Sequence, residues 1–391
     1  GLTGHYYNGP VPQGEPVQVR TDRTVNFNWI FALPHPALDA NCFSVVWTGS
    51  VVMPRTMDGC IGLSTQDSMR LYVDDKLLID GWGKDKSADQ ALDFHFEAGR
   101  TYKIRIEFVN DRRGARVIFG YSAGRENFPA AVEAARKADV AILCMGDNEE
   151  TSGENFDRTD LNLPGRQLEL VQAVYATGTP VVLVLQSGRP VTANWENDHL
   201  PAILEAWFPG EQGGTAIAKT LFGDAAPGGR LPITFPRSVG QIPCHYSRRP
   251  GGGKRYVEMD WLPLYPFGYG LTYTTFAYRD MALSRSVIDP QDTVTVSVTV
   301  TNTGKYTGDA VPQLYVRDMF SSVVKPERQL AAFRRLTLAP GESRRVELTV
   351  GPKQLRTLGP DYVWRVEPGK FELQLGDNAE NILLRADLTV E

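Results

Sequence analysis

The spacing of apolar residues changes twice along this chain, and that change constrains the fold more than any other feature of the sequence. Residues 1–123 alternate apolar and polar residues in short runs between turn residues, as the strands of a β-sandwich do. Residues 124–285 contain helix-spaced and continuous apolar runs, and residues 286–391 return to strict alternation. We therefore predict a multidomain protein with three domains at these boundaries. The middle domain is α/β, and the last is an immunoglobulin-like β-sandwich.

The middle segment has the pattern of strands that alternate with helices. Residues 181–185 form a continuous apolar run, which is typical of a parallel strand buried on both faces. Residues 140–145 form a second apolar run, and residues 164–176 have helical spacing. This alternation predicts an α/β sandwich with a mainly parallel sheet. A doubly wound layer normally has about five or six strands, so we expect further strands before Gly1 or on another chain.

Composition argues against several functional classes. The net charge of −5 disfavours non-specific nucleic-acid binding, which needs a basic surface. No apolar run reaches the ~18 residues that suggest a membrane span. The four cysteines form no C-x-x-C pair and the five histidines lack metal-ligand spacing, so we expect no metal site and no cofactor. Cys144 is expected to be a buried thiol, and a disulfide between Cys42 and Cys60 stays open.

A carboxylate-rich loop follows the apolar run at 140–145. It holds Glu149, Glu150 and Glu154 among Gly, Asn and Ser residues. Each glutamate is a candidate general acid or base, provided that its carboxyl group lies near a leaving oxygen. Arg158 is expected to support this loop, either by pairing with Asp157 or by linking the loop to its domain. From the residues alone, solvated loop charges are the simpler interpretation of all three glutamates.

An aromatic run at 265–273 has two interpretations. Its rings could form a platform on which a sugar stacks. They could also form a seam that docks the last domain, and we favour this second role.

Six motifs between residues 153 and 273 occur in one order. They are GENFDR (153–158) with LNLPG (161–165), SGRPV (187–191), AWFPGEQGG (206–214), LFGD (221–224) with PGGRLP (227–232), FPRSVGQIP (235–243) and LYPFGYGLTY (264–273). Together they resemble the C-terminal part of glycoside hydrolase family 3, the β-glucosidase group. Residues 286–391 look like that family's fibronectin type III-like domain. The runs GLTGHYY (1–7) and LYVDDKLLID (71–80) resemble a PA14 domain, which some members carry inside the α/β sandwich domain.

The resemblance implies that Glu154 is a general acid/base. In the family this glutamate lies in a loop of pattern E-G-x-D-R, and Asn155 stands here where glycine is usual. Asparagine can adopt the same positive φ at modest cost. Glu149 and Glu150 then remain loop charges, while Asp157 and Arg158 support the loop.

The resemblance also implies that this chain holds half of an active site. The family's nucleophile is an aspartate in an N-terminal (β/α)8 barrel, which cannot be drawn from this sequence. Retaining hydrolysis needs two carboxyl groups roughly 5 Å apart, so we expect activity only with the barrel-bearing portion of the same enzyme. The substrate would be a β-linked oligosaccharide, cleaved at a terminal non-reducing glucose. Trp29, Phe31 and Trp82 are candidate stacking residues, although core packing is the simpler role for each.

Alternatives remain at this point. The chain could serve a β-xylosidase of the same family, or a non-catalytic carbohydrate-binding or assembly module. A homo-oligomer and the origin of the break before Gly1 stay open. A secreted or periplasmic location is favoured over a cytoplasmic one.

Overall fold

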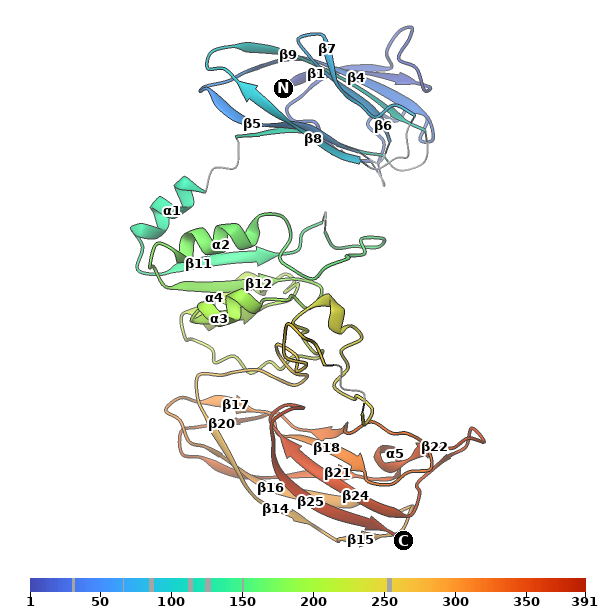
Figure 1. Ribbon diagram of the computed structural model, residues 1–391, viewed down its shortest axis with the longest axis vertical. Helices are drawn as coiled ribbons and strands as arrows, with labels where there is room; N and C mark the ends of the chain where they lie inside the picture. The colour runs from blue at the N-terminus through green and yellow to red at the C-terminus, as the bar shows by residue number, and fades with distance from the viewer. Residues whose placement is uncertain are drawn as a thin grey trace. The chain divides into compact units, whose positions relative to one another are not determined.

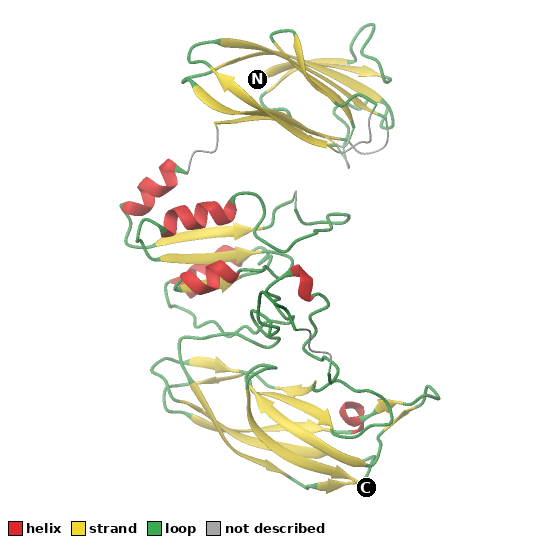
Figure 2. Ribbon diagram, viewed as in Figure 1, coloured by secondary structure: helices red, strands yellow, loops and turns green. Residues whose placement is uncertain are grey.

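The computed structural model describes residues 1–29, 32–65, 67–83, 88–111, 115–123, 128–149, 151–251 and 255–391. The chain forms two compact units, Gly1–Asn127 and Phe128–Glu391 (Figure 1). The helices drawn in Figure 2 all belong to the second unit. In the described part of the chain, none of these helices has the length and apolar character needed to cross a membrane.

The first unit consists of two antiparallel sheets. Its strands are β1 (Leu2–Asn8), β2 (Gln18–Asp22), β3 (Asn26–Asn28), β4 (Phe43–Val52), β5 (Met57–Thr65), β6 (Ser68–Val73), β7 (Lys76–Asp80), β8 (Ala88–Phe96), β9 (Thr101–Asn110) and β10 (Arg116–Ala123). One sheet has the order β2-β1-β4-β9-β6-β7 and the other β3-β10-β5-β8. The β6–β7 hairpin turns at Asp74 and Asp75, whose φ values are 49° and 62°. Two successive positive φ angles suit a tight hairpin turn.

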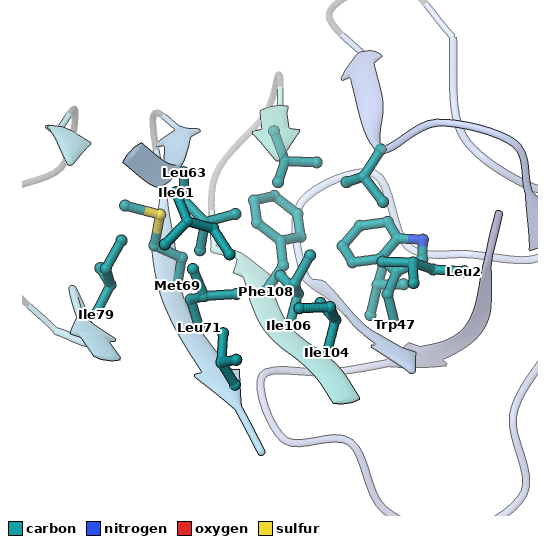
Figure 3. Close-up of a cluster of buried hydrophobic side chains, with 14 of the residues drawn as sticks. Leu2, Trp47, Ile61, Leu63, Met69, Leu71, Ile79, Ile104, Ile106 and Phe108 are labelled. Atoms are coloured by element: carbon teal, nitrogen blue, oxygen red, sulfur yellow. The ribbon is translucent and has the colours of Figure 1, made fainter. Parts of the chain in front are cut away.

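The core of the first unit lies between these sheets and is rich in aromatic side chains. Figure 3 shows this cluster, to which Trp47, Ile106 and Phe108 of the larger sheet and Ile61 and Leu63 of the smaller one belong. All five side chains are almost fully buried. Since apolar burial contributes about 25 cal/mol per Å², this cluster is the main source of stability for the unit.

The second unit begins with alternating helices and strands. They are α1 (Pro129–Arg136), β11 (Ala141–Gly146), α2 (Gln167–Tyr175), β12 (Val181–Gln186), α3 (Asn194–His199), β13 (Ala202–Glu205), α4 (Gly213–Leu221) and the 3-10 turn η1 (Val239–Gln241). The sheet order is β11-β12-β13, and both strand pairs are parallel. Tyr175 of α2 makes ring contacts with Trp195 and His199 of α3, so these two helices lie next to each other.

Two local expectations in this segment need correction, and one helix was missed. The helix predicted from Pro164 begins only at Gln167, because Gly165 has a φ of 61° and forms a turn instead. The short helix α3 was not predicted. Cys144 is exposed rather than buried, because side chains alternate between the faces of a strand. It lies on the same face of β11 as Ile142, which is also exposed, whereas Leu143 packs into the core beneath the helices.

The chain ends in a second β-sandwich. Its elements are β14 (Phe276–Leu283), β15 (Val287–Ile288), β16 (Val294–Asn302), β17 (Gly308–Ala310), β18 (Gln313–Asp318), β19 (Gln329–Phe333), β20 (Leu336–Leu338), β21 (Ser343–Val350), α5 (Pro352–Leu355), β22 (Thr357–Leu358), β23 (Trp364–Arg365), β24 (Gly369–Gly376) and β25 (Ile382–Val390). The main sheets are β14-β16-β21 and β15-β25-β24-β18-β19. Strand β14 pairs with β16. The sandwich therefore begins at Phe276, before the boundary at residue 286 that we predicted from the sequence.

A connecting segment, residues 242–275, links the α/β layer to this sandwich. Tyr246 stacks on Phe267 with ring centroids 4.2 Å apart, and it meets Tyr315 of β18 edge-on at 6.1 Å. The side chain of Gln313, also in β18, donates to the carbonyl of Gly268 at 3.0 Å. The last sandwich is therefore contacted by the ring of Tyr246 and by the backbone of the aromatic run at Gly268.

Candidate active site

The candidate site is the loop that leaves the carboxyl end of β11. Gly146 ends this strand with a φ of 140°, and a Cβ atom there would lie only 2.0 Å from the carbonyl oxygen of Gln186. Only glycine tolerates that approach. The side chain of Gln167 accepts from the Gly146 N–H at 2.7 Å and donates to its carbonyl at 2.8 Å. The end of β11, where the loop begins, is therefore held by close packing against Gln186 and by two hydrogen bonds with Gln167.

The loop is anchored by a buried carboxylate at Asp147. Its side chain is only 3% exposed. Oδ1 lies 3.3 Å from Nη1 of Arg158, and Oδ2 lies 3.4 Å from Nε of Arg189. The hydroxyl of Thr151 also donates to Oδ1 at 2.9 Å. A buried charge is tolerated when it is paired and hydrogen-bonded, and both oxygens of Asp147 meet that condition.

The two arginines extend this anchor to the loop backbone. Arg189 donates to the carbonyls of Thr151 at 3.1 Å and Phe156 at 3.4 Å. Arg158 donates to the carbonyl of Asn162 at 2.9 Å and pairs with Asp160 at 3.2 Å. The segment between Thr151 and Phe156 is thus held at both ends by one cluster of charges.

Glu154 lies at the middle of that segment and is exposed. Among the described residues its carboxylate makes no hydrogen bond and no ion pair. Asn155 follows with a φ of 65°, the left-handed conformation that glycine would supply. Glu149 is also exposed, and Glu150 lies outside the described residues. The geometry presents Glu154 to solvent on an anchored turn, where its carboxyl group can reach a bound ligand.

Asp157 and Arg158 have different surroundings. Arg158 is directed to Asp147 and Asp160, and none of its ion pairs within the described ranges involves Asp157. Of the two arrangements open from the sequence, the structure has the one in which Arg158 links the loop to its domain. Asp157 is exposed.

The three candidate stacking residues belong to the first unit. Trp29 is 9% exposed and stacks on Phe27 at 4.7 Å inside the aromatic core, so little of its ring is available to a ligand. Trp82 is half-buried, and the guanidinium of Arg70 lies 4.7 Å from its ring centroid. Phe31 lies outside the described residues.

Two carboxylates at the carboxyl ends of the parallel strands were missed by the sequence analysis. Asp147 was not singled out, because its partners lie 11 and 42 positions further along the chain. Glu205 ends β13, and one of its oxygens accepts from the Trp207 N–H at 2.9 Å. The other oxygen is buried without a partner in the described structure, and burial raises the pKa of this carboxyl to about 7. A lone glutamate in an otherwise apolar strand was the available signal for Glu205.

Within the described ranges, no group of three or more His, Cys, Asp or Glu residues is placed to hold a metal ion. Cys42 and Cys60 are free thiols rather than a disulfide.

Comparisons with known protein families match segments in both units of the chain. Residues 32–273 match the Glycosyl hydrolase family 3 C-terminal domain, and residues 310–379 match a Fibronectin type III-like domain. The chain is 45% identical over 302 residues to a β-xylosidase of Formosa agariphila, across 74% of this chain and 42% of that protein. It is also 42% identical over 263 residues to a periplasmic β-glucosidase of Salmonella typhimurium, and this match covers 64% of this chain and 34% of that protein.

A solved structure is similar over the whole length of this chain. It is a β-glucosidase from Kluyveromyces marxianus, with a TM-score of 0.76 and 27% sequence identity. The match covers 100% of this chain and 50% of that one. The chain therefore spans about half the length of this relative. It spans 42% of the length of the Formosa protein and 34% of the length of the Salmonella protein.

Proposed function

The chain belongs to glycosyl hydrolase family 3, and on that premise we propose that it is the C-terminal portion of a retaining, exo-acting β-glucosidase. Its substrates would be oligosaccharides with a terminal non-reducing β-D-glucosyl residue. The match to a C-terminal domain and the span of about half the length of its relatives support this assignment. Glu154 supplies the general acid/base, and the nucleophilic aspartate belongs to a barrel-bearing portion of the same enzyme.

The mechanism follows from two carboxyl groups on opposite sides of the glycosidic bond. In the first step Glu154 donates its proton to the leaving oxygen while the partner aspartate attacks the anomeric carbon. In the second step the Glu154 carboxylate removes a proton from water, which attacks the glycosyl-enzyme. Such a mechanism needs the two carboxyl groups roughly 5 Å apart. We therefore expect the isolated chain to be inactive.

One observation carries the proposal. Glu154 is the exposed carboxylate at the centre of a loop that Asp147, Arg158 and Arg189 hold in place. A catalytic carboxyl group needs both properties: access to the ligand, and a fixed position that lowers the entropic cost of reaction. Asp147 itself is a positioning residue, because both of its oxygens are occupied by arginines.

The remaining parts of the chain fit this assignment. We propose that the first unit is a PA14 domain, supported by its two antiparallel sheets and the runs at 1–7 and 71–80. Trp82 is its candidate stacking residue. A secreted or periplasmic location is supported by the periplasmic relative.

A second candidate is β-xylosidase activity, because the Formosa relative carries that name. A non-catalytic binding or assembly role is the third candidate. Hydrolysis of nitrophenyl β-glucoside and β-xyloside separates the three, measured for the chain alone and together with the barrel-bearing portion. We expect faster glucoside hydrolysis, and only with both portions present. Preference for the xyloside would select the second candidate. No hydrolysis by the complete assembly would select the third, and hydrolysis by the chain alone would overturn the split site.

A further inference from the structure

A cleft of about 430 Å³ opens where the connecting segment meets the last sandwich. Its volume falls within the range of about 300–1,000 Å³ that is common for small-molecule sites. Four aromatic residues line it: Tyr246, Tyr256, Trp261 and Phe267. Glu154 is not among the residues that line it, so the cleft is separate from the candidate catalytic loop.

The aromatic walls are held in fixed positions. Tyr246 and Phe267 stack on each other, and the hydroxyl of Tyr256 donates to the carbonyl of Gly240 at 3.0 Å. The guanidinium of Arg248 lies 4.5 Å from the ring centroid of Trp261, whose side chain is still 39% exposed. Because Arg248 holds one face of the Trp261 indole in place, the exposed part of the ring can bind a ligand with little loss of side-chain conformational entropy.

The polar groups of the cleft are also fixed. Arg248 donates from Nε to Glu327 at 3.0 Å and from Nη1 to Glu380 at 2.7 Å, with a longer contact of 3.4 Å from Nη2. Hydrogen bonds among the described residues thus engage three of its five N–H groups. The other N–H groups of Arg248 and the carboxylate of Glu380 can serve hydroxyl groups in the cleft.

The charges nearly balance, which favours a neutral ligand. Arg248 and Arg249 line the cleft together with Glu380, while Glu327 pairs with Arg248 and Arg328 pairs with Glu380. An isolated anion or cation would gain little net attraction there. A pyranose combines an apolar C–H face, which packs on an aromatic ring by dispersion, with hydroxyl groups that both donate and accept.

We propose that this cleft is an accessory binding site for β-linked gluco- or xylo-oligosaccharides, with Trp261 as its stacking platform. The site would hold a substrate chain or product away from the catalytic loop. It does not depend on the role of Glu154. The choice of these sugars rests on the proposed function, whereas a failure of Glu154 as the general acid/base would leave binding at this cleft unaffected.

The test is saturation-transfer NMR on the chain with cellobiose and with xylobiose. We expect binding with a dissociation constant of about 1–10 mM, and at least a tenfold loss of affinity in Trp261→Ala. Trp364→Ala is the matched control, because Arg356 covers that tryptophan at the same 4.5 Å and its side chain is 55% exposed. Trp364 does not line the cleft, so this variant should bind as the unaltered chain does.

A second measurement uses only the unaltered chain, so its result does not depend on whether a variant folds. In the unaltered chain labelled with ¹⁵N, the indole N–H signal of Trp261 should shift on addition of either disaccharide, while that of Trp364 stays in place. Absence of binding up to about 50 mM would overturn the proposal. So would binding that Trp261→Ala leaves unchanged, or an indole shift confined to Trp364.

Discussion

Nη1 of Arg158 lies 3.3 Å from Oδ1 of Asp147, which precedes it by 11 positions. This ion pair closes the loop that carries Glu154, and the Asp147 side chain is almost completely buried beneath it. The loop therefore owes its conformation to a buried charge pair rather than to regular secondary structure.

Replacement of Arg158 should loosen this loop. Arg158→Ala leaves the buried Asp147 carboxylate with Arg189 as its remaining arginine, so we expect a loss of about 1–3 kcal/mol in the free energy of unfolding. Urea denaturation measures this loss. Lys137→Ala is the control, because its pair with Glu133 is at the surface and should contribute about 0.5 kcal/mol or less. Equal effects of the two changes would show that the Asp147 pair does not anchor the loop.

Substitutions of Asn155 test whether the positive φ next to Glu154 matters for stability and activity. At a φ of 65°, Asn155→Gly should be tolerated, because glycine adopts this conformation without strain. Asn155→Ala should cost about 1 kcal/mol and lower kcat in the assembled enzyme by displacing the neighbouring carboxyl group. Thermal unfolding and steady-state kinetics give both quantities. An alanine variant as active and as stable as the glycine variant would contradict the importance of this turn.

Glu205 predicts a pH dependence of stability. Burial raises its pKa from 4.5 to about 7, so the folded state favours the protonated carboxyl. Its contribution to stability is fully present below pH 4.5 and is lost as the pH rises through about 7. As the pH rises from 5 to 8.5, the free energy of unfolding of Glu205→Gln should therefore increase by on the order of 1–3 kcal/mol relative to that of the unaltered chain.

Calorimetric unfolding across this pH range measures that difference. The exposed Glu211 provides the control, and Glu211→Gln should follow the unaltered chain at every pH. If the curves for Glu205→Gln and the unaltered chain stay parallel, Glu205 is not the titrating group.

The two tryptophans of the first unit should behave differently. Trp29 stacks within the aromatic core, so Trp29→Ala should lower the stability of that unit by about 3–5 kcal/mol. Trp82 is half-buried beneath one guanidinium, and Trp82→Ala should cost about 1 kcal/mol or less. Urea unfolding of the two variants provides the comparison. A larger loss for Trp82 would assign it to the core and remove it as a stacking candidate.

Local patterns in the sequence predicted much of the secondary structure. Strict alternation at 293–300 and 344–350 became β16 and β21, and the apolar run at 181–185 became β12. The turn at Asp74 and Asp75 was also predictable, because short polar residues favour a positive φ. In each case the deciding interaction lies within a few residues.

The remaining features depend on contacts between distant residues. The Asp147 anchor needs Arg158 and Arg189 together, which no local pattern reveals. The exposure of Cys144 follows from which face of β11 is covered, and an apolar run cannot distinguish the two faces. The role proposed for Glu154 comes from the motif GENFDR, because the residues alone left all three glutamates of the loop as solvated charges.

The most direct test of the account is Glu154→Gln in the chain assembled with its barrel-bearing portion, assayed on cellobiose and nitrophenyl β-glucoside. We expect kcat on cellobiose to fall by about 10²–10⁴-fold. The nitrophenyl substrate, whose leaving group needs little protonation, should give a burst of nitrophenol and then slow turnover. Glu149→Gln, which alters an exposed charge in the same loop, should retain full activity. Turnover of cellobiose by Glu154→Gln within about threefold of the unaltered enzyme would contradict the assignment of Glu154 as the general acid/base.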